Sequence, residues 1–171
     1  MMVLGASGQV GSWVMQLARA KGCKVIGVGR TEADIDSTAD PSLSKAKELT
    51  GGKGPDVVID TVGDFGLLKA AFDVVAPYGR IVPIAAPRQG STEFPVDVLS
   101  LYRRQVSLVG CNSIPHSQAA MAKILREELV PLLESGKVKA PELDGVRRVS
   151  IEEAIEAYRT KVKKGLVVFD D

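Results

Sequence analysis

Three small residues, Ala6, Gly8 and Gly11, have the spacing of a phosphate-binding turn within the stretch "VLGASGQVGSW" at positions 3–13. Between a strand and a helix, the first such residue permits the tight turn and the second lets the backbone approach a pyrophosphate, while the third lets helix and strand pack closely. Unpaired N–H groups and the macrodipole at the helix N-terminus then favour negative charge. The pattern predicts binding of a dinucleotide diphosphate; the alternative is a turn that serves only helix packing.

The elements that would position this turn form a strand–helix–strand unit. Residues 2–4 predict a short buried strand, and residues 24–28 predict the next strand. A helix between them, ending at Gly22, is predicted by apolar residues at helical spacing, which are Val10, Trp13, Val14, Leu17 and Ala18. Since the two strands would then be parallel, this context favours cofactor binding over a bare turn.

The end of the second predicted strand bears on the choice of cofactor. Folds that bind NAD place an acidic residue there, about 20 residues beyond the glycines, to bind the ribose hydroxyls. This chain has Gly29, Arg30 and Thr31 at that place, and no carboxylate. Because a guanidinium pairs with a 2′-phosphate whereas an acid repels it, the sequence favours NADP(H) over NAD. The alternative for Arg30 is a solvated loop cation.

The rest of the chain continues the alternation of strands and helices. Further strands are predicted at residues 56–60, 80–84, 105–110, 146–150 and 165–169. Helices are predicted at about residues 42–49, 65–75, 96–102, 117–134 and 150–158, with Pro131 bending the fourth and a capping box of Ser150 and Glu153 opening the fifth. The alternation predicts an α/β fold, a doubly wound parallel sheet of the Rossmann type.

Composition excludes several classes of partner and site. A net charge of +1 in 171 residues, without a basic block, argues against nucleic acid and membrane surfaces. The sequence lacks an apolar run of membrane-spanning length and a signal-peptide pattern, so we expect a cytoplasmic protein. Two cysteines and one histidine, His116, form no cluster with zinc-ligand spacing, so no metal is expected. Cys23, beside a predicted strand, is expected to be a buried thiol.

Several stretches together resemble the cofactor-binding half of the medium-chain dehydrogenase/reductase superfamily, which includes zinc-type alcohol dehydrogenases and zinc-free quinone oxidoreductases. The stretches are "GASGQVGSWVMQLARAKGCKVIGVGR", "KELTGGKGPDVVIDTVG", "YGRIVPIAAP" and "LYRRQVSLVGCNS". The form "GASGQVG" looks more like the quinone oxidoreductase branch, although Gln9 stands where many relatives have glycine. The resemblance covers nearly the whole chain.

The resemblance implies a set of cofactor-binding positions. The glycine turn would line the pyrophosphate, the end of the second strand would face the adenosine ribose, and later loops would border the middle and the nicotinamide end of the cofactor. In chain order these residues are Ala6, Ser7, Gly8, Gln9, Val10, Gly11, Gly29, Arg30, Thr31, Thr61, Val62, Gly63, Ile84, Ala85, Ala86, Cys111, Asn112 and Ser113. For the aliphatic members, the alternative is simple core packing.

Two departures from the family pattern shape our expectations. Full-length relatives carry an N-terminal domain with substrate contacts and, in the zinc enzymes, the metal ligands, whereas this chain begins at the first strand of the cofactor domain. We therefore expect a dinucleotide-binding domain at residues 1–113, and a segment at 114–171 that in relatives packs partly on the absent domain. Between Arg30 and Asp56 the chain is also about a dozen residues shorter than its relatives, which is the length of the helix that normally follows the second strand. We therefore expect that residues 33–36, "ADID", do not make the usual third parallel strand. We also expect the wall of the cofactor pocket on the adenine side to be thinner than in relatives.

Two functions remain open at this stage. The first is an NADP(H)-dependent oxidoreductase, quinone oxidoreductase-like or alcohol dehydrogenase-like, of which this chain is the nucleotide-binding domain; the second is a non-catalytic dinucleotide-binding or scaffold module. No catalytic residue is assigned, because the phenols of Tyr78, Tyr102 and Tyr158 are better explained by packing. The predicted edge strand at residues 105–111, from Gln105 to Cys111, is expected to pair with a second copy in a homodimer. A separate catalytic domain is a further expected partner.

Overall fold

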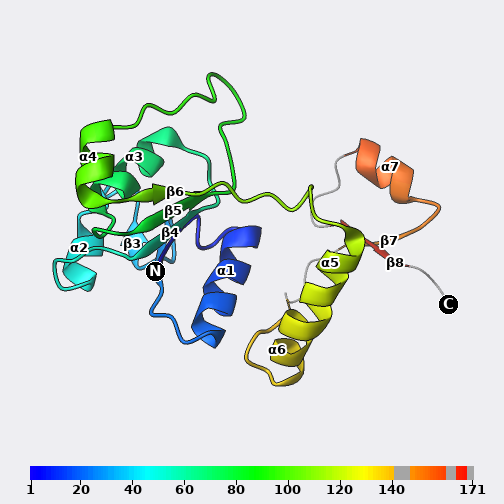
Figure 1. The fold of residues 1–171 in the computed structure, drawn as a ribbon. Coiled ribbons are helices and arrows are strands. Elements are labelled where there is room, and N and C mark those ends of the chain that lie inside the picture. Colours follow the sequence, from blue (N-terminus) through cyan, green and yellow to red (C-terminus); the bar gives the residue numbers. More distant parts are fainter. Residues whose placement is uncertain (141–146, 161–164, 169–171) are drawn as a thin grey trace. The chain divides into compact units, whose positions relative to one another are not determined.

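A computed structural model describes residues 1–140, 147–160 and 165–168. The chain divides into two compact units, Met1–Val138 and Lys139–Asp171 (Figure 1). The domain boundary expected between residues 113 and 114 stays a prediction.

The first unit is built on a six-stranded parallel sheet, with the strand order β3-β2-β1-β4-β5-β6. The strands are β1 (Met2–Leu4), β2 (Ile26–Gly29), β3 (Ile35–Asp36), β4 (Val57–Asp60), β5 (Arg80–Pro83) and β6 (Ser107–Leu108). Because the chain passes from β3 at one edge back to β4 beside β1, the order reverses between β1 and β4. The predicted doubly wound sheet of the Rossmann type is confirmed, and such sheets bind ligands at this reversal point.

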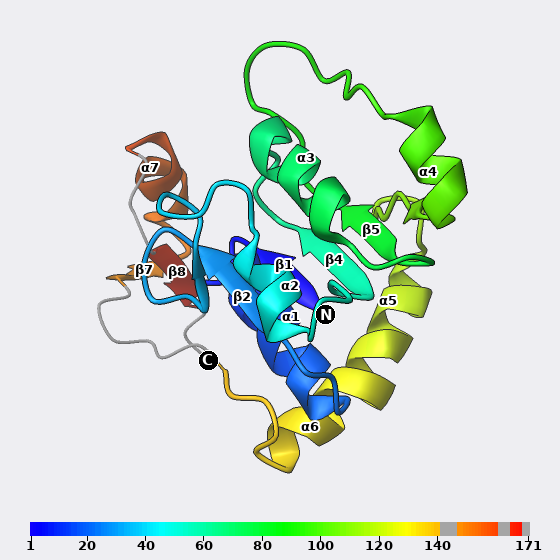
Figure 2. The same cartoon turned by 90° about the vertical axis from the view of Figure 1, so that its left-hand side faces the viewer.

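Helices cover both faces of this sheet. They are α1 (Gln9–Ala20), α2 (Lys45–Leu49), α3 (Phe65–Val74), α4 (Val98–Arg104), α5 (Gln118–Ile124), the π-helical turn η1 (Leu125–Leu129) and α6 (Val130–Glu134). Figures 1 and 2 place α1 on one face and α3 on the other. The side chain of Lys21, at the end of α1, pairs with Glu128 of η1. Because α5, η1 and α6 follow one another without a break, the helix predicted at 117–134 is confirmed. The π-helical turn ends two residues before Pro131, which cannot donate a backbone hydrogen bond.

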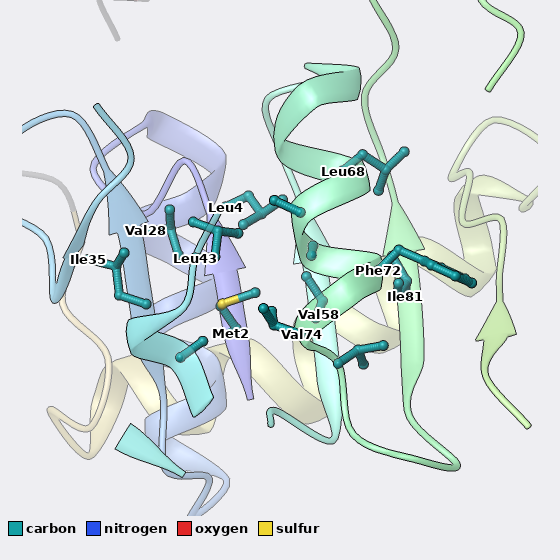
Figure 3. Close-up of a cluster of buried hydrophobic side chains, with 14 of the residues drawn as sticks. Met2, Leu4, Val28, Ile35, Leu43, Val58, Leu68, Phe72, Val74 and Ile81 are labelled. Carbon is teal, nitrogen blue, oxygen red and sulfur yellow. The ribbon is translucent and has the colours of Figure 1, made fainter. Parts of the chain in front are cut away.

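The core of the first unit lies between the strands and α3 (Figure 3). Val28 of β2, Val58 of β4 and Ile81 of β5 are fully buried, and Leu68 and Phe72 of α3 belong to the same buried cluster. Parallel strands covered on both faces carry such continuous apolar runs because neither face meets water. This core holds the carboxyl ends of the strands in one row.

The expectation that residues 33–36 form no parallel strand is wrong, because Ile35–Asp36 pairs with β2 as β3. A full crossover between parallel strands takes about a dozen residues because the chain must return along the whole strand. Here Ile35 lies opposite Val28 and Asp36 opposite Gly29, so the chain returns along only two residues of β2. The carboxylate of Asp34 also accepts a hydrogen bond from Gly27 N at 2.7 Å, which extends the pairing by a side chain. The strand is shortened, but it is present.

Exposure corrects two further expectations. Cys23 is exposed rather than buried, because α1 ends in a turn at Gly22, with φ +81°, and β2 begins only at Ile26. The three tyrosines do not pack either: Tyr78, Tyr102 and Tyr158 are 75%, 61% and 87% exposed. None of the three phenols therefore serves the core.

The second unit contains a parallel pair of strands, β7 (Arg147–Ser150) and β8 (Gly165–Val168), with α7 (Ala154–Arg159) between them in sequence. The Ser150 hydroxyl accepts a hydrogen bond from Glu153 N at 3.3 Å, which is the first half of the predicted capping box. The helix begins at Ala154, later than predicted. The predicted strand ends at residues 146 and 169 lie outside the described residues.

Candidate functional site

An open cleft of about 980 Å³ lies along the carboxyl edge of the sheet in the first unit. It is lined by Gly5, Ser7, Gly8, Val28, Gly29, Arg30, Ser37, Thr38, Pro41, Thr61, Val62, Asp64, Gly66, Leu67 and Arg88. These residues lie at or after the carboxyl ends of five adjacent strands, from β3 to β5, and the cleft therefore spans the point where the strand order reverses. Ligands bind to open α/β sheets in this position.

The turn after β1 presents backbone amides to this cleft. Gly5 has φ +79°, a conformation that glycine adopts without strain, and the N–H groups of Gly5 and Ala6 both donate to Val28 O at 2.9 Å. Gly8 is exposed, and as the N-cap of α1 it provides no side-chain cap. The first amide that finds an acceptor inside the helix is that of Ser12, which donates to Gly8 O at 2.8 Å. Gly8 N donates to Gly5 O at 2.9 Å, so the amides that remain available to an anion at this helix end are those of Gln9, Val10 and Gly11.

Gly11 has the packing role expected of the third small residue. A Cβ at this position would lie 2.0 Å from Gly5 O, so only glycine allows α1 to lie this close to the turn. A Cβ on Gly8 would lie 3.1 Å from the same oxygen. The two glycines therefore have different roles. Gly11 allows the close packing of α1, and Gly8 leaves the N-terminus of α1 accessible.

The loop after β4 is tied to this turn and forms the opposite wall. The Thr61 hydroxyl donates to Leu4 O at 2.8 Å. The fully buried carboxylate of Asp60 accepts from Val62 N at 2.8 Å and from Gly63 N at 3.2 Å through Oδ1, while its Oδ2 has no partner among the described residues. Burial raises the pKa of the Asp60 carboxyl above its ordinary value near 3.8, against the lowering effect of these two amides.

Arg30 and Arg88 are the cations that line the cleft within the described part of the chain. Both residues are exposed, and no hydrogen bond or ion pair joins either guanidinium to a described residue. Asp64 is the one carboxylate among the described lining residues, and its Oδ1 already accepts from Leu67 N at 2.9 Å as the N-cap of α3. The cleft thus combines two unpaired positive charges with the positive end of α1, an arrangement that suits a ligand with more than one phosphate.

The structure brings six of the predicted site residues to this cleft: Ser7, Gly8, Gly29, Arg30, Thr61 and Val62. Five more, Ile84, Ala85, Ala86, Cys111 and Asn112, line a neighbouring hollow of about 540 Å³ with Phe65 and Phe94. Gly63 is buried between the two loops, where a Cβ would lie 2.7 Å from Ala86 O. Ala6 lines a third hollow, on the Asp34 side of the turn. Gln9, Val10, Gly11, Thr31 and Ser113 line none of these three hollows.

Sequence reasoning missed several residues that line the cleft. Ser37, Thr38 and Pro41 follow β3, and recognising that strand would have placed them at this edge. Gly66 and Leu67 belong to the first turn of α3, whose start was predicted. Arg88 lies in an irregular loop five residues after β5, and no motif in the sequence marks it.

No group of three or more His, Cys, Asp or Glu side chains that could hold a metal ion is found in the described ranges 1–140, 147–160 and 165–168. None of the helices in those ranges is both long and apolar enough to cross a membrane. The absence of a metal and the cytoplasmic location remain predictions.

Most of the chain is similar to known proteins. Residues 10–127 match a protein family described as zinc-binding dehydrogenase. A zinc-type alcohol dehydrogenase-like protein of Schizosaccharomyces pombe is 40% identical over 159 residues, which cover 92% of this chain and 48% of that protein. A quinone oxidoreductase-like protein 2 homolog of Nematostella vectensis is 29% identical and is matched over 99% of this chain and 50% of its own length. This chain spans about half the length of the curated relatives that it matches.

Solved structures show the same relationship. An alcohol dehydrogenase superfamily protein from Novosphingobium aromaticivorans superposes with a TM-score of 0.71 at 28% identity, covering 92% of this chain and 49% of that one. A quinone oxidoreductase from Pseudomonas syringae also gives 0.71, at 26% identity, with 99% of this chain and 56% of that one covered.

Proposed function

Because the chain belongs to the zinc-binding dehydrogenase family and forms the cofactor-binding half of the medium-chain dehydrogenase/reductase fold, we propose that it binds NADP(H) in the cleft along the carboxyl edge of its sheet. In this proposal it is the nucleotide-binding part of an oxidoreductase of the quinone oxidoreductase or alcohol dehydrogenase type. The observation that carries the proposal is the uncapped N-terminus of α1, which opens beside the unpaired guanidinium of Arg30.

The preference for the phosphorylated cofactor rests on the charges at the adenosine end. Arg30 follows β2, where a carboxylate would bind the free ribose hydroxyls of NAD, and Ser37 and Thr38 follow β3 beside it. A guanidinium can form two parallel hydrogen bonds with a phosphate. Among relatives, one from Sulfolobus acidocaldarius is named an NAD-dependent alcohol dehydrogenase, so the choice between the cofactors depends on this chain's own residues.

When bound, the nicotinamide supplies the hydride chemistry. The residues of this chain bind and orient the cofactor: the Gly8 turn holds the diphosphate, and the loop that Asp60 braces borders the middle of the cofactor. No described side chain in the cleft is placed as a general acid or base, since Asp64 is engaged as a helix cap. We therefore propose that substrate contacts come from a further domain or a separate chain.

Calorimetric titration with NADPH and NADH tests the proposal. We expect NADPH to bind more tightly than NADH, and we expect Arg30→Ala to remove most of the difference by weakening NADPH alone. Arg103→Ala, which removes an exposed arginine of α4 that does not line the cleft, is the matched control. No binding of either nucleotide would contradict the proposal. Binding without consumption of NADPH in the presence of a quinone or an enone would favour a non-catalytic binding module.

A further inference from the structure

Arg88 shares the cleft with the Gly8 turn, although it comes from a loop far from that turn in the sequence. We propose that Arg88 binds the phosphate on the nicotinamide side of the cofactor's diphosphate. Arg30, in contrast, faces the 2′-phosphate on the adenosine side. This inference rests on the proposed function and adds to it a residue that serves NAD(H) and NADP(H) alike.

The strand order places the two arginines on opposite sides of the mouth of α1. Arg30 follows β2, the turn that contains Gly8 follows β1, and Arg88 comes five residues after β5. With neighbouring strands about 4.8 Å apart, β1 lies one spacing from β2 and two spacings, about 10 Å, from β5. A dinucleotide crosses such a sheet with its diphosphate at the helix N-terminus and the adenosine ribose beside the second strand. The nicotinamide half therefore extends toward β4 and β5, where Arg88 lies.

Arg104 and Arg88, both in this unit, differ in whether the guanidinium has a hydrogen-bond partner within the protein. Arg104 donates from Nη1 to Phe72 O at 2.8 Å and also bonds Val75 O, so its guanidinium is committed to the end of α3. Arg88 has no such partner among the described residues. Asp64, the carboxylate on the same wall, is within ion-pair distance of no described cation. The charge of Arg88 is therefore left for a ligand.

If Arg30 and Arg88 bind different phosphates, each substitution should weaken a different set of ligands. A general positive field in the cleft would weaken all of them alike. Adenosine 2′,5′-bisphosphate carries the 2′-phosphate but lacks the nicotinamide-side phosphate, whereas NADH carries the diphosphate but lacks the 2′-phosphate. Each ligand therefore reports on one arginine, and NADPH reports on both. A charge-assisted hydrogen bond to a phosphate accounts for about tenfold in affinity.

The experiment is calorimetric titration of the 171-residue chain with NADPH, NADH and adenosine 2′,5′-bisphosphate. We expect Arg88→Ala to weaken NADPH and NADH about tenfold each and to leave the bisphosphate within about twofold. We expect Arg30→Ala to weaken NADPH and the bisphosphate and to spare NADH. Arg88→Lys should recover part of the loss, and Arg103→Ala should change none of the three affinities. Circular dichroism of each variant checks that the chain is folded.

Each outcome decides the inference. Equal weakening of all three ligands by Arg88→Ala would show a general electrostatic effect and overturn the assignment to the nicotinamide-side phosphate. Unchanged affinities for NADPH and NADH would overturn any contact with Arg88, while leaving the proposed function standing. Failure of the unsubstituted chain to bind any of the three would overturn the proposed function, and this inference with it.

Discussion

Replacing Gly11 with alanine should push α1 away from the turn that precedes it. The new Cβ would lie 2.0 Å from Gly5 O and 2.8 Å from Gly5 C. Close contacts between carbon and a carbonyl oxygen begin at about 3.3 Å, so the helix and the turn must separate by roughly 1.3 Å. The two atoms that the new Cβ would meet belong to the backbone of Gly5, so no side-chain rotation relieves the overlap.

The net cost follows from two opposing effects. Alanine is favoured over glycine inside a helix by about 1 kcal/mol. Overpacking of a well-packed interior costs about 1–3 kcal/mol, and an overlap between two backbone segments belongs at the upper end of that range. We therefore expect the free energy of unfolding to fall by about 2 kcal/mol. For a chain of this size that corresponds to a fall in Tm of roughly 4–8 °C.

Urea unfolding, followed by the fluorescence of Trp13, measures this change inside the helix concerned, since Trp13 lies in α1 and is the single tryptophan of the chain. Gly110→Ala is the matched control, because a Cβ there meets no atom within 4 Å. A Gly11→Ala variant as stable as the parent would refute the packing role of Gly11.

Gly8→Ala should lower the free energy of unfolding by no more than about 1 kcal/mol, because alanine is a poorer N-cap than glycine. It should still weaken NADPH binding, because the new methyl group stands at the N-terminus of α1.

Three further outcomes test other parts of the structure. Arg104→Ala removes two charge-assisted hydrogen bonds, to Phe72 O and Val75 O, and should lower the free energy of unfolding in urea by about 1.5–3 kcal/mol, with a smaller loss for Arg104→Lys. The raised pKa of Asp60 means that its contribution to stability is full below its ordinary pKa and is lost as the pH rises through its folded pKa. Asp60→Asn should therefore gain in stability relative to the parent between pH 3 and pH 7 in paired urea titrations, and a constant difference would contradict the burial of a charge. Leu108→Lys, in the exposed edge strand β6, should prevent the predicted homodimer in light scattering at low micromolar concentration, and a parent chain that is itself monomeric would refute that dimer.

Local patterns in the sequence predicted most of the fold. The turn at Gly8, the helix after it and the alternation of strands and helices all depend on neighbouring residues, and that alternation predicted the parallel sheet that the structure shows. The edge strand was predicted over residues 105–110, yet only Ser107–Leu108 pairs with β5. The strand begins later than predicted because Gln105 takes a left-handed conformation, φ +52°, at the end of α4. Element boundaries depend on such contacts, which apolar periodicity does not encode.

The sequence alone determined that this chain carries a glycine turn with the spacing of a phosphate-binding turn, a guanidinium where NAD-binding folds have an acid, and a parallel sheet to hold both. Tertiary structure alone decided that residues 35–36 form a strand, because the register of that strand against the end of β2 makes a five-residue connection long enough. It also decided that Arg88 joins the cleft, since the order of the strands brings a loop 80 residues further along the chain to the wall opposite Arg30 and the Gly8 turn. Proximity across parallel strands depends on how the whole sheet is ordered, and no local pattern of residues records that order.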